Sequence, residues 1–83
     1  MKIALKLFAS LGKHLPPDAE RNTIELEVPE RMTIQAVLGR VGIPRESVKL
    51  VFVDGVHQLP EDLACRFLEP GETLAVWPPV AGG

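Results

Sequence analysis

Clustered positive charge is missing from this sequence. The nine lysine and arginine residues are scattered, no two of them are adjacent, and the formal net charge is −2. Phosphate contacts dominate the affinity of nucleic-acid-binding proteins, so such proteins usually show a basic patch. We therefore expect no nucleic-acid partner.

Long apolar runs are missing as well. No stretch approaches the roughly 20 apolar residues that a transmembrane helix requires. The apolar N-terminal segment is interrupted by Lys6, and no small-residue cleavage site follows it, so it lacks the pattern of a signal peptide. We expect a soluble, cytoplasmic protein with no membrane partner.

Cysteine occurs once, as Cys65. A lone thiol excludes an internal disulfide framework and suits a reducing compartment. Cys65 could act as a nucleophile with His57 and Asp62 only if the fold brought the three together, and a thiol near apolar residues is more often buried and structural. His14, His57 and Cys65 do not have metal-ligand spacing. We expect neither catalysis nor a bound metal.

Apolar and polar residues alternate in three segments of the chain. Residues 2–8 and 22–28 alternate with a period of two, which is typical of half-buried strands. Residues 73–77 form the last such strand. The glycine and prolines of residues 9–21 predict a loop between the first two strands.

The middle of the chain carries a different strand signal. Residues 48–53 are a nearly continuous apolar run rich in β-branched and aromatic residues, which predicts a buried central strand. Asp54-Gly55 is a strong turn signal, and residues 56–59 would return as a short strand. Residues 60–70 predict irregular structure with one helical turn.

One helix is predicted after Pro29. Thr33 is a plausible N-cap, and Gly42 lies where a left-handed C-terminal residue is wanted, just before Pro44. Gly39 should weaken this helix by roughly 1 kcal/mol relative to alanine. Between the caps, apolar residues fall at the i, i+3, i+4, i+7 spacing of one helical face: Ile34, Val37, Leu38 and Val41.

The order strand, strand, helix, strand, short strand, strand predicts an α+β fold. We expect a mixed sheet of four to five strands packed on one helix, because strands and a single helix must bury their apolar faces against each other. The predicted domain covers residues 1–77, and residues 78–83 form an extended tail.

The outer face of this sheet is predicted to carry apolar side chains. If the inward faces are assigned correctly, Ala4, Phe8, Ala75 and Trp77 point away from the helix. An exposed apolar patch often marks an interface, and Trp is enriched among interface anchors. We predict that Phe8, Ala75 and Trp77 contact a partner; the alternative is that the protein's own loops cover part of this set.

The sequence ends in PPVAGG. Two prolines favour an extended backbone that would project the tail from the sheet, and glycine lets a backbone approach a surface closely. Such a tail suits a Gly83 carboxylate that must reach a site buried in another protein. Adenylation by ATP would supply a leaving group, after which sulfur would give a thiocarboxylate and an amine would give an amide.

Three segments resemble the MoaD/ThiS family of ubiquitin-like sulfur carriers. MKIALKLFASL resembles the first strand, VKLVFVDGVHQLPEDL the middle hairpin region and LEPGETLAVWPPVAGG the C-terminus. The resemblance covers almost the whole chain, and PPVAGG is closer to MoaD, the small subunit of molybdopterin synthase, than to ThiS, the thiamine sulfur carrier. It implies the β-grasp fold of ubiquitin and a protein that is not an enzyme by itself and binds no cofactor permanently.

The resemblance also implies partners and site residues. In this family an adenylating enzyme related to ubiquitin-activating enzymes uses ATP to activate the terminal glycine, which becomes a thiocarboxylate and delivers sulfur. In molybdopterin synthase the tail inserts into the large subunit. Gly83 would then hold the thiocarboxylate, and partner clefts would recognise Pro78, Pro79, Val80, Ala81 and Gly82.

The pathway stays open at this point. Trp77 stands where the family often has Phe, and the loop at residues 12–21 need not match. Related proteins serve molybdenum or tungsten cofactor assembly, thiamine synthesis, RNA thiolation or protein conjugation. A modifier joined through Gly83 to target lysines, and a β-grasp interaction module with an inert tail, are the alternatives to a sulfur carrier.

Overall fold

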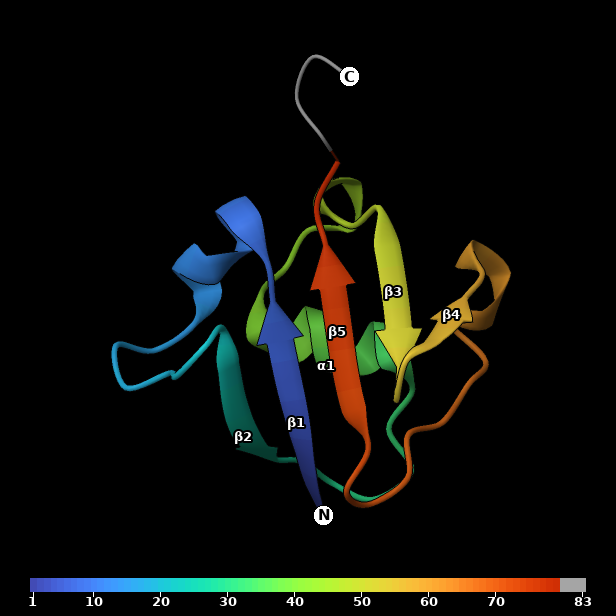
Figure 1. The fold of residues 1–83 in the computed structure, drawn as a ribbon. Helices are drawn as coiled ribbons and strands as arrows, with labels where there is room; N and C mark the ends of the chain where they lie inside the picture. The colour runs from blue at the N-terminus through green and yellow to red at the C-terminus, as the bar shows by residue number, and fades with distance from the viewer. Residues whose placement is uncertain (80–83) are drawn as a thin grey trace.

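The computed structural model describes residues 1–79. This range contains β-strands, one α-helix and short 3₁₀ helices, in the order β1-η1-β2-α1-η2-β3-β4-η3-β5 (Figure 1). The strands are β1 Lys2–Leu7, β2 Thr23–Glu27, β3 Leu50–Val53, β4 Val56–Gln58 and β5 Thr73–Trp77. The α-helix is α1 Ile34–Val41, and the short 3₁₀ helices are η1 Ala9–His14, η2 Arg45–Ser47 and η3 Pro60–Asp62.

The strands of this range form one mixed sheet in the order β2-β1-β5-β3-β4. β1 pairs with β5 in parallel, and the other neighbours are antiparallel. Figure 1 shows α1 lying across one face of the sheet, behind β1 and β5. The predicted α+β architecture of strands packed on one helix is therefore confirmed, with five strands in the sheet.

The core lies between α1 and the inner face of the sheet. The parallel pair β1 and β5 supplies alternate residues to it, so the alternation predicted for residues 2–8 and 73–77 is confirmed. Each fully buried aliphatic side chain contributes about 1.5–3 kcal/mol to folding. The fully buried side chains include Ile3, Leu5, Leu7, Leu74 and Val76 from these strands and Ile34 and Val37 from the helix.

Both predicted ends of the helix are confirmed. The Thr33 hydroxyl accepts a hydrogen bond from the Ala36 N–H at 3.1 Å, which satisfies one of the free donors of the first turn. Gly42 has φ 89° and donates its N–H to the carbonyl of Leu38. Glycine adopts this left-handed backbone without a Cβ penalty, so the helix ends there.

The β3–β4 hairpin turns where the sequence predicts it. Asp54 and Gly55 have φ 49° and 82°, and positive φ at both central residues matches the right-handed twist of the flanking strands. Val53 and Val56 pair across the turn. Asp54 also accepts the Thr73 N–H at 2.8 Å, which ties the turn to the start of β5.

Two predictions about local structure are wrong in part. The predicted loop of residues 9–21 contains the 3₁₀ helix η1, because Leu11 turns inward and is buried in the core. The predicted buried central strand at residues 48–53 is buried on one face only: Val51 and Val53 are in the core, whereas Leu50 is 38% exposed. β5, not β3, occupies the centre of the sheet.

Candidate functional site: the outer face of the sheet at the end of β5

The end of β5 is held on both sides by neighbouring chain segments. The Phe8 N–H donates to the Val76 carbonyl at 3.1 Å, and the Lys49 N–H donates to the Trp77 carbonyl at 2.8 Å. These hydrogen bonds fix the strand up to its last residue. Pro78 and Pro79, two of the predicted tail residues, therefore leave the sheet from its central strand, and neither proline can donate a ladder hydrogen bond.

The remaining predicted tail residues lie outside the described residues. These are Val80, Ala81, Gly82 and Gly83. The division into a domain at 1–77 and a tail at 78–83 stays a prediction, although β5 ends at Trp77.

Two aromatic rings stack beside the end of β5. The ring centroids of Phe8 and Trp77 are 3.9 Å apart and their planes differ by 5°. Phe8 directly follows β1, Trp77 is the last residue of the neighbouring β5, and Trp77 is 40% exposed. Aromatic pairing of this kind contributes roughly 0.5–1.5 kcal/mol beyond the burial of area, so the stack presents a firm aromatic surface to solvent.

Strand pairing extends this surface across β3. Leu50 lies opposite Trp77, and Phe52 lies opposite Ala75. The structure thus brings the predicted interface residues together with two further apolar side chains. We call this set the outer apolar patch: Phe8, Leu50, Phe52, Ala75 and Trp77.

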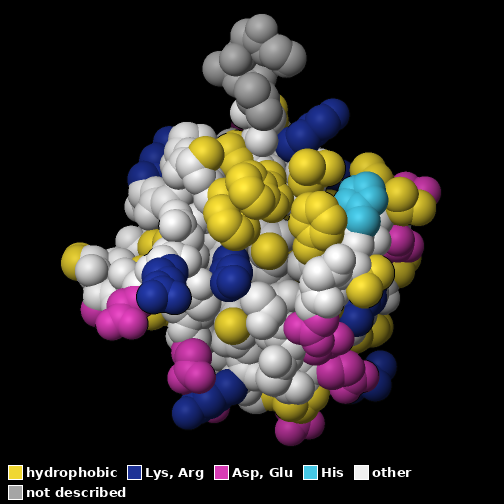
Figure 2. Space-filling model, viewed as in Figure 1, with side chains coloured by type: hydrophobic (Ala, Val, Ile, Leu, Met, Phe, Trp, Pro, Cys, Tyr) yellow, Lys and Arg dark blue, Asp and Glu magenta, His cyan; other side chains and the backbone are white. Residues whose placement is uncertain are grey.

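Figure 2 shows hydrophobic side chains gathered on this face, in the upper half of the view. His57 adjoins the patch, since its ring centroid is 5.4 Å from that of Phe52. The sequence analysis missed Leu50 and Phe52. No polar–apolar alternation in residues 48–53 marks these two side chains, and they are identified as outward-facing only because the helix covers one face of the sheet.

The predicted state of Cys65 is wrong. Its thiol is exposed, and the Sγ donates to the Glu61 carbonyl at 3.5 Å. The side chain is exposed because the short segment after η3 turns Leu63 and Leu68 into the core. His57 packs against Phe52, and the Asp62 carboxylate accepts the Leu59 N–H at 3.2 Å.

The side chains of Cys65, His57 and Asp62 therefore contact three different groups, and none of these contacts joins two of the three residues. Within residues 1–79 no group of three or more His, Cys, Asp and Glu side chains is arranged to hold a metal ion. Over the same range, no helix has the length and apolar character needed to cross a membrane.

One ion pair lies at the opposite end of β5. The Arg66 guanidinium donates to both carboxylate oxygens of Glu72, at 3.1 and 2.8 Å, and Glu72 also accepts the Glu69 N–H at 2.7 Å. The hydrogen bond from Arg66 is the main cause that lowers the pKa of Glu72, and the same bond raises the pKa of Arg66. Because Glu72 directly precedes β5, whose other end carries Trp77, this pair supports the fold and not the outer apolar patch.

Comparison with solved structures identifies the fold. The crystal structure of SAMP1 from Haloferax volcanii matches with a TM-score of 0.66 at 23% identity, covering 100% of this chain and 100% of that chain. A putative subunit 1 of molybdopterin converting factor from Pyrococcus furiosus matches with a TM-score of 0.64 at 19% identity, covering 95% and 98%. The chain therefore has the ubiquitin-like β-grasp fold.

A third solved structure contains two subunits. It is the complex of subunits 1 and 2 of molybdopterin-converting factor from Helicobacter pylori, with a TM-score of 0.56 at 18% identity and coverage of 100% of both chains. A search of curated proteins finds no significant match to the sequence.

A match to a protein-family model shows which family the chain belongs to. The model described as Mut7-C ubiquitin matches residues 1–82, which is nearly the full length of the sequence. The resemblance to MoaD and ThiS thus holds at the level of the ubiquitin-like fold, and the chain belongs to the Mut7-C ubiquitin family.

Proposed function

We propose that this protein is a ubiquitin-like sulfur carrier whose Gly83 carboxylate is activated and converted to a thiocarboxylate. The observation that carries the proposal is the place where β5 ends. Pro78 and Pro79 leave the central strand of the sheet next to an exposed apolar patch. A partner that docks on the patch would receive the residues that follow Pro79 at a fixed point.

The chemistry requires an adenylating enzyme, a source of sulfur and an acceptor for the sulfur. An adenylating enzyme would join the Gly83 carboxylate oxygen to the α-phosphorus of ATP and release pyrophosphate. A sulfide-level sulfur nucleophile would then form a C–S bond at the acyl carbon as the C–O bond to AMP breaks. An acceptor would take the sulfur. The likeness to subunit 1 of molybdopterin-converting factor, and the subunit 1–subunit 2 complex, support an acceptor subunit in molybdopterin or tungstopterin synthesis.

The outer apolar patch is the docking surface in this proposal. Trp77 and Leu50 keep 40% and 38% of their surface exposed, and burying an apolar surface contributes about 25 cal/mol per Å². Aromatic side chains are enriched among the residues that dominate interface energies. The stacked Phe8 ring would hold Trp77 in place, so less side-chain conformational entropy is lost when the partner docks.

The first measurement is the intact mass of the protein purified from its own cells under conditions that preserve thiocarboxylates. We expect a gain equal to the replacement of one oxygen by one sulfur, localised to Gly83. Chains joined through Gly83 to lysines of other proteins would favour the alternative, a ubiquitin-like modifier. An unmodified chain in every fraction, even with its activating enzyme and ATP supplied, would refute both.

Two variants test the roles of the tail and the patch separately. Deletion of Gly83 should abolish the modification and leave the denaturation midpoint unchanged, because glycine has no side chain to bury in a core. Leu50→Ala should slow modification, whereas the matched control Val56→Ala, which removes another exposed apolar side chain outside the patch, should not. Equal rates for the two alanine variants would remove the patch from the docking surface.

A further inference from the structure

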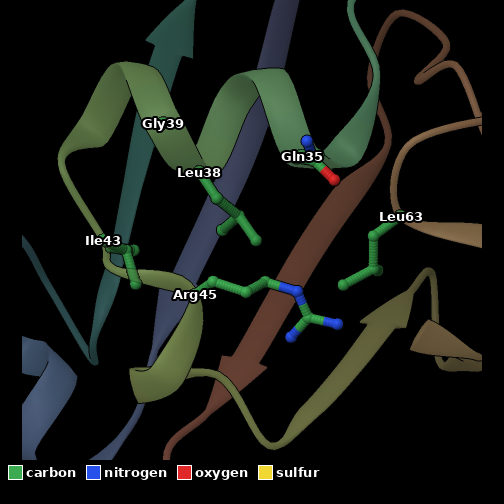
Figure 3. A pocket seen from close by; sticks show the side chains of 6 residues that line it. All are labelled: Gln35, Leu38, Gly39, Ile43, Arg45 and Leu63. Carbon is green, nitrogen blue, oxygen red and sulfur yellow. The ribbon is translucent and has the colours of Figure 1, made fainter. Parts of the chain in front are cut away.

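A second concave site lies on the helix side of the molecule, away from the outer apolar patch. It is a cavity of about 300 Å³ lined by Gln35, Leu38, Gly39, Ile43, Arg45 and Leu63. Figure 3 shows side chains from α1, from η2 and from the segment after η3 converging on it, with the Arg45 guanidinium extended between Leu38 and Leu63. The sequence analysis assigned no role to these residues as a group.

The walls of the cavity are fixed by the fold. The Gln35 N–H donates to the Leu63 carbonyl at 2.8 Å, and the Ile43 N–H donates to the Leu38 carbonyl at 3.0 Å. The aliphatic side chains of Leu38, Ile43 and Leu63 belong to the core and are 2–5% exposed. They therefore form a preformed apolar floor, and a ligand would not need to order it.

The rim of the cavity carries polar donors. Arg45 presents a guanidinium, and Gln35 lies above it with its carboxamide (Figure 3). Among residues 1–79 the ion pair that forms is Arg66–Glu72, so Arg45 has no carboxylate partner there. A guanidinium offers two parallel donors that match a carboxylate. The cavity thus combines an apolar floor with a recognition group for one negative charge.

Gly39 points to the same conclusion. Glycine within a helix is less stable than alanine, yet Gly39 does not have a positive φ, and a Cβ at this position would meet no atom within 4 Å. The isolated fold therefore has no need for glycine there. What the missing Cβ provides is open space over the helix backbone at the cavity, where the main chain of a ligand could lie.

We propose that this cavity binds the carboxyl-terminal residue of a partner protein, with an aliphatic side chain on the Leu38–Ile43–Leu63 floor and its α-carboxylate on Arg45. A single terminal residue supplies both groups, and about 300 Å³ is at the small end of ligand sites. The ligand's backbone passes over Gly39. Because α1 covers the inner face of the sheet, this partner and one docked on the outer apolar patch occupy opposite sides.

The test is an amide NMR titration of the full chain with N-acetyl-leucine, a mimic of a terminal aliphatic residue. The neutral N-acetyl-leucinamide is the matched control ligand. We expect saturable shifts at Gln35 and Gly39 with the acid and binding at least about tenfold weaker with the amide, since a hydrogen bond to a charged group is among the stronger ones. Equal affinities for the two ligands, no saturable shift, or shifts centred on the outer apolar patch would each overturn the proposal.

Three variants locate the interaction. Arg45→Gln should weaken N-acetyl-leucine binding about tenfold or more, whereas Arg40→Gln, the matched change at an exposed arginine of α1 outside the cavity lining, should leave it unchanged. Gly39→Ala should weaken binding without lowering the denaturation midpoint. Equal effects of the two arginine variants, or full affinity in Gly39→Ala, would contradict the assignment. These readouts involve neither Gly83 nor sulfur, so they stand apart from the carrier function.

Discussion

Gly39 in α1 and Gly42 at its C-terminal cap should respond to the same substitution with stability changes of opposite sign. Gly39 lies inside the helix with a backbone that any residue can adopt, and a Cβ there meets no atom within 4 Å. Gly42 ends the helix with φ 89°. Alanine at either position adds one methyl group, so the difference between the two variants reports how backbone conformation affects the free energy of unfolding.

The magnitudes follow from helix propensity and backbone sterics. Gly39→Ala should raise the free energy of unfolding by about 1 kcal/mol, because alanine is the better helix former and loses less backbone entropy on folding. Gly42→Ala should lower it by roughly 1–2 kcal/mol, because an L residue is strained in the left-handed region. For a domain of this size, each 1 kcal/mol shifts the melting temperature by roughly 4–8 °C.

Thermal and urea denaturation of the two variants and the parent chain, followed by far-ultraviolet circular dichroism, give the measurement. The two melting temperatures should fall on opposite sides of the parent value. A lower stability of Gly39→Ala would show that the space above the helix is occupied, which would also remove the open space on which the proposed cavity ligand depends. An unchanged stability of Gly42→Ala would show that the left-handed helix end is absent in solution.

Three further perturbations test single contacts. Thr33→Ala should lower the free energy of unfolding, measured by urea denaturation, by about 1 kcal/mol because it removes the N-cap acceptor. An unchanged free energy of unfolding would mean that the cap does not stabilise α1. Glu72→Gln should destabilise by up to about 1 kcal/mol at neutral pH, since the pair with Arg66 is partly exposed. Because the folded-state pKa of Glu72 is lowered, the greater stability of the parent chain over Glu72→Gln should disappear as pH falls through that pKa. A stability difference that persisted in acid would contradict the assignment of the ion pair. A double-mutant cycle of Phe8→Ala and Trp77→Ala should give a coupling free energy of roughly 0.5–1.5 kcal/mol, and additive effects would mean that the rings do not stack in solution.

Local signals along the chain determined the elements and their ends. Thr33 and Gly42 bound α1 because a side-chain acceptor and a left-handed backbone are properties of single residues. Asp54-Gly55 set the hairpin turn for the same reason. Alternation placed Ile3, Leu5 and Leu7 inward, because successive side chains of a strand point to opposite faces.

Which segments of the chain lie next to one another was decided only by the tertiary structure. The apolar run at residues 48–53 has no alternation to show which side chains are covered, and the single helix over the sheet leaves Leu50 and Phe52 on the outer face. Cys65 is exposed because Leu63 and Leu68 on either side of it take the core positions. The cavity at Arg45 joins residues of the 35–45 segment with Leu63, which is distant from them in sequence. Periodicity reports the face on which a side chain lies, whereas contacts between distant segments depend on strand order and helix position, which no local pattern contains.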